Sequence, residues 1–336
     1  MTNRTIPVAI FVFWLATTSW LVITKVVPGM RRGNPPNHHL VSAKQLRDIE
    51  PVVWDLKLDG HPMGWAASKV EDLDDGRMEI RTRVQFKAFP LEKSESAMRL
   101  VKKFADWAFS GTNAPLQFDN RTLLDKRGRL EAIYSSARFR DFDNSRPWMC
   151  VEGFVEDEKL ELTFYVGENS VMKKTLAMRD DALISNEVSP CGFMPPLRLN
   201  QQWRTYQVNP FRASSGWQST IVAKVERLDG IIWDNRAVET FRVVYRKDAG
   251  AGSLAADEHL GLMWVRPTDG MVLQQEVLLL GSRLTFYRRP VDEARPLAEA
   301  LDRQWWGKVP VQLTEQSSTV NRVRDGALPP DTAPAP

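Results

Sequence analysis

Apolar and polar residues alternate with a period of two along most of the chain beyond residue 50. Within residues 78–86 the uncharged side chains that share one face are Met78, Ile80, Thr82, Val84 and Phe86. Charged and amide side chains occupy the other face. This alternation predicts a β-strand with one buried and one solvated face. The same pattern recurs at residues 52–58, 160–166, 221–225, 241–245, 259–265, 272–280 and 283–287.

Turn signals of one kind lie between these segments. Asp-Gly pairs occur at residues 59–60, 75–76, 229–230 and 269–270, and Arg127 with Gly128 is a weaker example. Glycine supplies the positive φ that short hairpin turns require. Because such turns join neighbouring strands, we expect an antiparallel sheet. Strands longer than about six residues with one apolar face are expected to curl over a second sheet, a helix or a ligand.

Two segments in this part of the chain have helical spacing. The first spans about residues 94–109, and the second spans about residues 295–306, where Leu297, Leu301 and Trp305 form an apolar stripe. The predicted fold class is therefore mainly β: a large curved antiparallel sheet with one or two covering helices.

An uncharged apolar run at residues 6–24 precedes the predicted sheet. Its length matches the roughly 20 residues that a helix needs to cross a bilayer. A cleaved signal peptide is the alternative, but the run exceeds an h-region of about 7 to 15 residues and lacks an A-x-A-like site. We therefore expect a single, retained transmembrane helix that anchors the chain in the cytoplasmic (inner) membrane.

The orientation of this anchor depends on nearly balanced charges. Arg4 and the N-terminus oppose Lys25, Arg31 and Arg32, a count that slightly favours a cytoplasmic C-terminal side. We expect the opposite, a periplasmic or otherwise exported β domain, because the architecture and the cysteine count suit export. The predicted organisation is an anchor (1–27), a linker (28–50), a β domain (51–316) and a disordered Pro-rich tail (317–336).

Charge gives no indication of a nucleic-acid partner. The formal net charge is +3, and acidic and basic residues are interspersed. Arg138, Arg140 and Arg146 alternate with acidic and aromatic residues, which favours a solvated strand face over a binding patch.

Cys150 and Cys191 are the only cysteines. They could form one disulfide, worth about 4 kcal/mol in the chain-entropy model. Two unpaired cysteines packed as small apolar residues are an equal alternative. Their spacing excludes a C-x-x-C pair.

Motifs that specify a reaction are missing from the sequence. We expect no metal and no cofactor, because His38, His39, His61 and His259 are not placed at ligand spacing. An envelope hydrolase is the alternative function. It would need a carboxylate in a cleft, or Cys191 beside His61 or His259.

Aromatic residues suggest where a ligand could bind. Most tryptophans beside the strands are expected to fill the core. The sharper hypothesis is an apolar sheet face that holds a lipid acyl chain or an extended peptide. Its candidate ligand-binding residues are Trp54, Phe86, Trp217 and Trp264.

The segment WDLKLDGHPMGW at residues 54–65 resembles the opening hairpin of uncharacterised bacterial membrane-anchored envelope proteins with a long β-meander. Residues 124–130, 216–217, 225–228 and 264–273 fit later parts of that meander in the same order. In outline such domains are similar to periplasmic lipoprotein carriers. The resemblance implies an exported domain that handles lipid or lipoprotein, and it implies no catalytic residue.

The function expected from the sequence is therefore non-enzymatic. The chain is expected to be a membrane-anchored envelope protein that binds lipid, lipoprotein or an extended peptide, with the hydrolase as the alternative.

Overall fold

The structure is a computed structural model that describes residues 5–22, 52–90, 113–139, 147–167, 169–178, 182–184, 189–208, 218–248, 259–279 and 282–305. Most of these residues form strands, as the alternation predicts, and the fold is mainly β. The strands are β1 (Val52–Leu58), β2 (His61–Asp72), β3 (Met78–Pro90), β4 (Asn113–Leu124), β5 (Leu130–Phe139), β6 (Met149–Glu156), β7 (Lys159–Val166), β8 (Asn169–Ala177), β9 (Ala182–Ile184), β10 (Gln202–Val208), β11 (Gln218–Trp233), β12 (Arg236–Lys247), β13 (Gly261–Val265), β14 (Val272–Leu279) and β15 (Ser282–Arg288).

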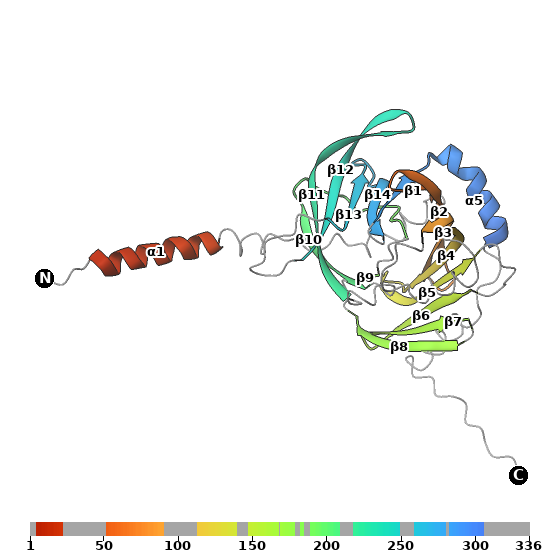
Figure 1. Ribbon diagram of the computed structural model, residues 1–336, viewed down its shortest axis with the longest axis horizontal. Helices are drawn as coiled ribbons and strands as arrows, with labels where there is room; N and C mark the ends of the chain where they lie inside the picture. Colours follow the sequence, from red (N-terminus) through yellow and green to blue (C-terminus); the bar gives the residue numbers. More distant parts are fainter. Residues whose placement is uncertain are drawn as a thin grey trace, which may run out of the picture. The chain divides into compact units, whose positions relative to one another are not determined.

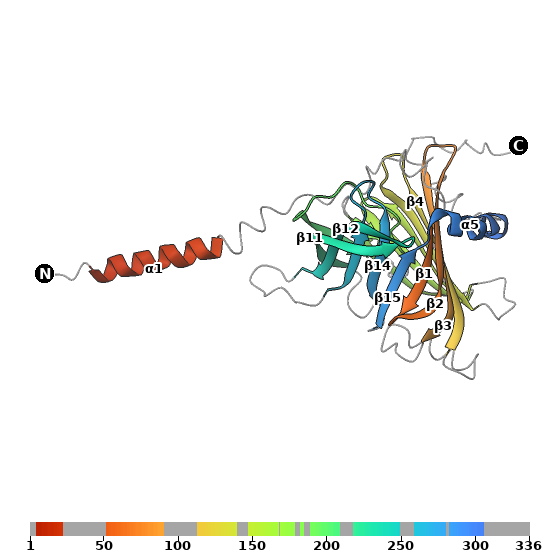
Figure 2. The same ribbon diagram turned by 90° about the horizontal axis from the view of Figure 1, so that it is seen from above.

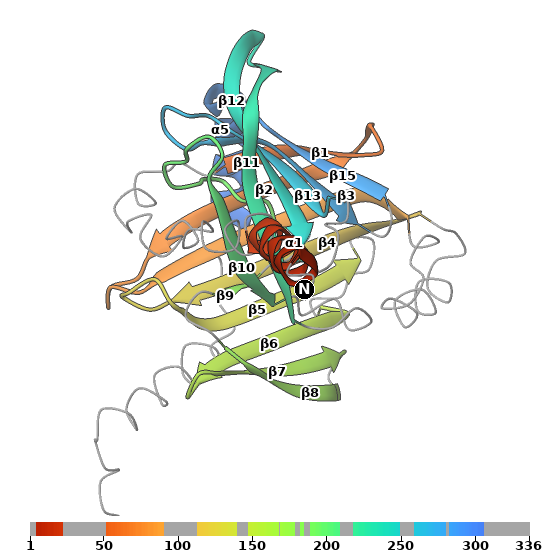
Figure 3. The same ribbon diagram turned by 90° about the vertical axis from the view of Figure 1, so that its left-hand side faces the viewer.

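The chain divides into two compact units. Unit 2 contains β1 to β8 and the part of β15 from Phe286 onward, whereas unit 1 contains β9 to β14 and β15 up to Thr285. Within each unit consecutive strands are hydrogen-bonded neighbours. The pairings from β1 to β8 and from β10 to β14 are antiparallel, and β9 runs parallel to β10. Figure 3 shows β2 to β8 as successive rows of one sheet, and Figure 1 shows that this sheet curves.

The predicted turns at residues 59–60, 75–76, 127–128 and 269–270 all connect neighbouring strands. Asp59 and Gly60 have φ values of 48° and 85°, which suit a primed hairpin turn. The predicted turn at residues 229–230 is wrong, because both residues lie inside β11. The chain instead reverses at Asp234 and Asn235, which have φ values of 52° and 57°. Asp and Asn tolerate this left-handed conformation better than most residues do.

Two helices fall within the described residues. The first, α1 (Thr5–Leu21), lies in the apolar N-terminal run, and the second is α5 (Val291–Trp305). Within the described part of the chain, no helix combines the length and the apolarity needed to cross a membrane. The predicted helix at residues 94–109 lies outside the described residues, as do the linker and the Pro-rich tail.

The start of α5 differs from the expectation by about one turn. Asp292 and Glu293 occupy its first turn, where negative charge stabilises the N-terminal end of a helix. Pro296 suggests a helix start near residue 295, but it lies inside α5. The helix therefore begins before the proline.

The sheet of unit 2 buries both of its faces around β3. Even-numbered residues of β3 lie on one face, which we call the apolar face and where Val84 and Phe86 are buried. Odd-numbered residues lie on the other, which we call the charged face. There Glu79 is 3% exposed and Arg81 is 9% exposed. The expectation that this second face is solvated is therefore wrong, and its charges must be neutralised by neighbours.

Helix α5 covers one end of the charged face. Val53 of β1 and Ala67 of β2 are paired in register, and they form a buried cluster with Ala294 and Leu301 of the helix. Figures 1 and 2 both show α5 beside β1 and β2, on the convex side of the curved sheet. Just before the helix, Arg289 donates a hydrogen bond from Nη2 to Oδ1 of Asp55 at 2.6 Å. The predicted covering role of this helix is confirmed.

Strand β8 ends the hydrogen-bonding order of unit 2. It pairs with β7, and all of its side chains except Leu176 are exposed. Lys173 and Lys174 lie next to each other in the middle of the strand. The strand at this edge of the sheet is therefore strongly solvated.

Replacing Gly64 with alanine tests the close approach of β2 to β3. A Cβ at residue 64 would lie 1.8 Å from the carbonyl oxygen of Gln85, so the strands would have to separate. We expect Gly64→Ala to lower the free energy of unfolding by about 2 to 3 kcal/mol, measured by chemical denaturation. Gly230→Ala is the control, because a Cβ there meets nothing within 4 Å. Equal stability of the two variants would contradict the close packing of β2 and β3.

Candidate functional site

The apolar face of unit 2 is built from side chains of five neighbouring strands. The register of β1 to β5 places these buried residues on one side of the sheet: Trp54, Leu56, Ala66, Val84, Phe86, Leu116, Phe118, Ala137 and Phe139. The rings of Phe86 and Phe118 meet edge to face with their centroids 6.0 Å apart. The face is continuous and mostly aromatic or aliphatic.

A row of polar side chains crosses this apolar face. Ser68, Thr82, Asn120 and Ser135 are paired in register across β2, β3, β4 and β5. Thr82, Asn120 and Ser135 are buried, and the hydroxyls of Ser68 and Thr82 lie 3.1 Å apart. Burying hydroxyl and amide groups costs free energy unless they are hydrogen-bonded. We call these four residues the polar row.

The indole of Trp54 adds a buried donor at the end of the polar row. Trp54 lies two residues from Val52, which pairs with Ser68. Its side chain is 0% exposed, and its Nε1 has no hydrogen-bond partner within the part of the chain that the structure describes. The guanidinium of Arg288 lies 5.9 Å from the centre of the ring. The apolar face thus offers one buried N–H group that could donate to a bound acceptor.

The structure brings together only part of the predicted ligand-binding set. Trp54 and Phe86 share the apolar face of unit 2. Trp264 belongs to unit 1, where it packs with Val244, Leu262 and Ile231 and donates from Nε1 to Asp229 at 3.4 Å. Trp217 lies outside the described residues.

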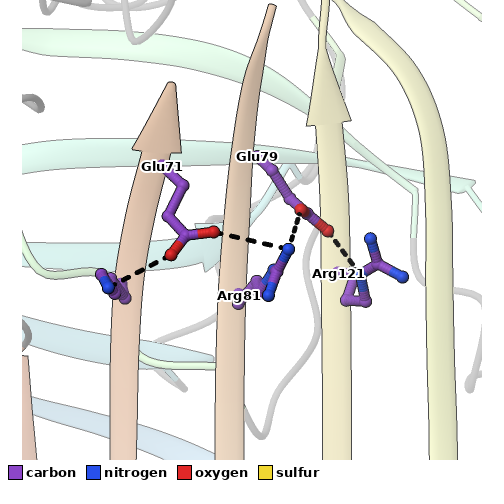
Figure 4. A network of polar contacts seen from close by, with 5 residues as sticks. Glu71, Glu79, Arg81 and Arg121 are labelled. Carbon is purple, nitrogen blue, oxygen red and sulfur yellow. Dashed lines mark hydrogen bonds and ion pairs between the residues drawn. The ribbon is translucent and has the colours of Figure 1, made fainter. Parts of the chain in front are cut away.

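The charged face carries a chain of ion pairs across β2, β3 and β4 (Figure 4). Glu79 lies between two guanidinium groups: Arg81 donates to it at 2.6 Å, and Arg121 donates from Nε to its other carboxylate oxygen. Arg81 also pairs with Glu71 at 3.4 Å, and Glu71 pairs with Lys69 at 3.1 Å. Each charge in this chain therefore has an opposite charge beside it.

The pKa of Glu79 reflects this arrangement. Burial by itself raises the pKa of the carboxyl group, but hydrogen bonds from Arg81 and Arg121, together with their charges, outweigh burial and hold the pKa below its ordinary value. Glu79 is therefore ionised at neutral pH, which fits a structural ion pair and not a catalytic acid.

A second group of ion pairs surrounds Asp119 on the same face. Arg83 donates to one oxygen of its carboxylate at 2.5 Å, while Gln117 donates to the other oxygen at 2.8 Å. Arg138 lies 3.3 Å from that second oxygen. Arg138 is thus part of an ion-pair network, and its side chain is 35% exposed; Arg140 and Arg146 lie outside the described residues.

No disulfide joins Cys150 and Cys191 in the structure. Cys150 is in unit 2, where burial raises the pKa of its thiol to about 12, with a further contribution from the charge of Glu152. It shares a hydrogen bond with Tyr134, whose pKa is also raised, mainly by burial. A thiol that stays protonated at neutral pH is a poor nucleophile.

The cysteine of the hydrolase hypothesis has structural partners. In unit 1 the thiol of Cys191 donates to the carbonyl oxygen of Phe193 at 3.0 Å, and its backbone N–H donates to Gln275 at 2.8 Å. His259 lies 3.6 Å from Glu276, and His61 belongs to unit 2. A carbonyl oxygen cannot act as the general base that a cysteine nucleophile requires. Among the described residues, no group of three or more His, Cys, Asp and Glu side chains could hold a metal ion.

Sequence patterns could not reveal the polar row or the ion-pair network. Thr82 reads as part of an apolar strand face, and only the strand register shows that Ser68, Asn120 and Ser135 lie beside it. A threonine in an otherwise apolar alternation was the one available signal. The arginine and glutamate residues on the opposite face predict a polar face, but they do not predict that this face is buried.

Glu79→Gln tests whether the ion pairs stabilise the sheet. The variant removes the carboxylate that pairs with the buried Arg81 and the half-buried Arg121, so we expect the free energy of unfolding at neutral pH to fall by about 3 kcal/mol. The lowered pKa of Glu79 means that its stabilisation is complete above the unfolded-state value of about 4.3 and is lost as the pH falls through the folded-state value.

Denaturation between neutral pH and about pH 3 measures both effects. Wild-type protein should lose stability more steeply below about pH 4 than the variant does. The control is Glu156→Gln, because Glu156 is exposed at the end of β6. Parallel acid curves for wild type and Glu79→Gln would rule out this role.

Comparison with known proteins gives little further information. No protein-family model matches the chain, and no curated protein matches it. One similar solved structure is a β-barrel-like protein of domain of unknown function DUF1849 from Brucella abortus, which is 8% identical with a TM-score of 0.40 over 71% of this chain and 94% of that one. Another is a DUF1089 family protein from Pseudomonas aeruginosa, 13% identical with a TM-score of 0.29 over 62% of this chain and 87% of that one. Neither is described as a lipoprotein carrier.

Proposed function

We propose that the chain is a membrane-anchored, non-enzymatic binding protein of the cell envelope. Its ligand is an amphipathic molecule, most simply a lipid, whose acyl chain lies against the apolar face of unit 2. The observation that carries this proposal is the buried donor of Trp54 beside the polar row on an otherwise apolar surface. Binding sites for small molecules combine mostly apolar walls with a few polar groups that fix orientation.

The polar groups argue for a ligand because a filled core does not need them. A buried N–H without an acceptor costs about 1 to 3 kcal/mol. Replacing Trp54 by an aromatic residue without this donor would remove that cost, whereas a ligand with an ester or amide carbonyl would satisfy the donor. Ser68 and Thr82 offer hydroxyls that can donate or accept beside the same end of the face.

The surface of α1 supports the anchor. Its side chains from Ile10 to Leu15 are all between 50 and 71% exposed, and all of them are apolar. In water such exposure on all sides of a helix is unfavourable, whereas in hydrocarbon it is favourable. We propose that α1 belongs to the inner-membrane anchor, with the β domain on the periplasmic side.

Native mass spectrometry of the full-length protein tests ligand binding. Wild-type protein, purified in mild detergent and incubated with phospholipid, should carry one lipid per chain after release from the micelle. Trp54→Phe keeps the ring but removes the donor, and it should weaken binding about tenfold, the effect of one hydrogen bond. Thr82→Val removes a hydroxyl of the polar row and should also weaken lipid binding.

Thr175→Val is the matched control, because Thr175 is exposed on β8. Lipid held by α1 alone would be retained equally by every variant, so such a result would show that the apolar face is not the binding site. Wild-type protein that stays empty would also contradict the proposal.

A pair of C-terminal fusions to the full chain tests the orientation. Alkaline phosphatase is active only after export, because it needs disulfides. A fluorescent protein that folds only in the cytoplasm reports a cytoplasmic C-terminus. We expect phosphatase activity without fluorescence. Fluorescence without phosphatase activity would place the β domain in the cytoplasm, in agreement with the simple count of flanking charges.

A further inference from the structure

We propose that the tip of the hairpin formed by β11 and β12 inserts an apolar face into the surface of the bilayer that holds α1. The inference rests on the proposed membrane anchor and concerns a second contact with the same membrane. The hairpin segment in question comprises residues 227–240 of unit 1, which we call the ribbon.

The ribbon extends beyond the strands on either side of it. In the described residues β10 pairs with β11 only from Gln218 to Lys224, and β13 pairs with β12 only from Phe241 to Tyr245. Beyond those limits β11 and β12 pair with each other up to Trp233 and Arg236. Figures 1 and 3 both show this hairpin projecting past β10 and β13.

One face of the ribbon is held against the rest of unit 1. Ile231 packs against the buried cluster of Val244, Leu262 and Trp264. The guanidinium of Arg266 lies 5.4 Å from the centre of the Trp233 ring. Thr240 is buried and donates its hydroxyl to the carbonyl of Asp229 at 2.8 Å. A two-stranded ribbon alone would be only marginally stable, so these contacts fix its direction.

The opposite face of the ribbon is exposed and apolar. Ile232 is 77% exposed and Leu228 is 44% exposed. The register places Ala237 beside Ile232 on this face, and it places Phe241, the residue just after the ribbon, beside Leu228. Glu239 is the one charged residue of this face. Ile232 is the most exposed large apolar side chain among the described residues. Exposure of the Ile232 side chain to water is unfavourable, so we infer that this face contacts an apolar partner.

A bilayer suits this face better than a protein does. A stable protein interface buries about 800 Å² on each side and depends on Trp, Tyr and Arg anchors. Two aliphatic side chains at the end of a ribbon provide neither. Insertion into a bilayer requires apolar area alone, without a matching surface. Arg227 and Arg236 are exposed on the other face of the ribbon, so insertion of the apolar face keeps their charges out of the hydrocarbon.

The anchor would make even a weak contact effective. Residues 22–51 separate α1 from β1, and a chain of 30 residues can extend at most about 100 Å. A domain tethered so closely to a bilayer meets its surface at a high effective concentration. The ribbon then needs to contribute only a small affinity of its own to hold the domain in one orientation.

Spin-label accessibility in the full-length protein tests this contact. Ile232→Cys is labelled in a background where Cys150 and Cys191 are replaced by alanine and serine, and circular dichroism compares its fold with wild type. The protein is placed in nanodiscs of phosphatidylethanolamine and phosphatidylglycerol. Collision of the label with oxygen, which concentrates in hydrocarbon, is compared with collision with a water-soluble nickel complex. Control labels are placed at Arg236, on the other face of the ribbon, and at Thr17, in α1.

We expect the label at residue 232 to collide frequently with oxygen and rarely with the nickel complex. The label at residue 236 should collide frequently with the nickel complex. Nickel access at both positions would overturn the inference, because the ribbon would then lie in water. Loss of both collisions at residue 232 would also overturn it, since a protein or a second copy of the chain would cover the face. The label at residue 17 should collide with oxygen and not with nickel, which shows that α1 lies in the bilayer. Nickel access at residue 17 would mean that the anchor has failed, and this failure would remove the basis for both proposals.

Discussion

The ion pairs between Glu79 and the arginines at positions 81 and 121 allow the sheet of unit 2 to be buried on both sides. A buried charge without a partner costs several kcal/mol, so a charged face without them would have to remain in water. With its charges neutralised, the sheet can be covered at one end of this face by α5. The opposite face is then left to aromatic and aliphatic residues. The candidate binding surface therefore depends on polar contacts on the far side of the same strands.

Local sequence patterns predicted the strands well where alternation was regular. β3 and β7 were identified from their side-chain period, and three hairpin turns were identified from Asp-Gly pairs, at residues 59–60, 75–76 and 269–270. The turn at residues 229–230 failed because tertiary pairing continued β11 past a sequence that suits a turn. An Asp-Asn pair five residues later provides the reversal. Turn chemistry indicates where a chain is able to reverse, and strand pairing decides where it does.

The candidate site was harder to predict than the fold. Alternation places Trp54 and Phe86 on apolar strand faces, but it cannot show that both faces belong to one surface. That relation depends on strand register, and a bulge between Leu56 and Lys57 shifts the pairing of β1 with β2. Trp264 looks the same in sequence, yet it packs in unit 1. Single-strand patterns contain no information about which strands become neighbours.

The charges of strand β8 affect whether copies of the chain associate through their sheet edges. Strand addition between copies requires an open edge with unpaired backbone N–H and C=O groups and little charge. In the proposed membrane-anchored state, copies of the chain would diffuse in two dimensions and meet far more often than they do in solution, so an unguarded edge would favour polymerisation. Lys173 and Lys174 place two adjacent positive charges on that edge, and each copy carries the same pair. Electrostatic repulsion between identical edges would therefore keep a crowded population of these domains as separate molecules.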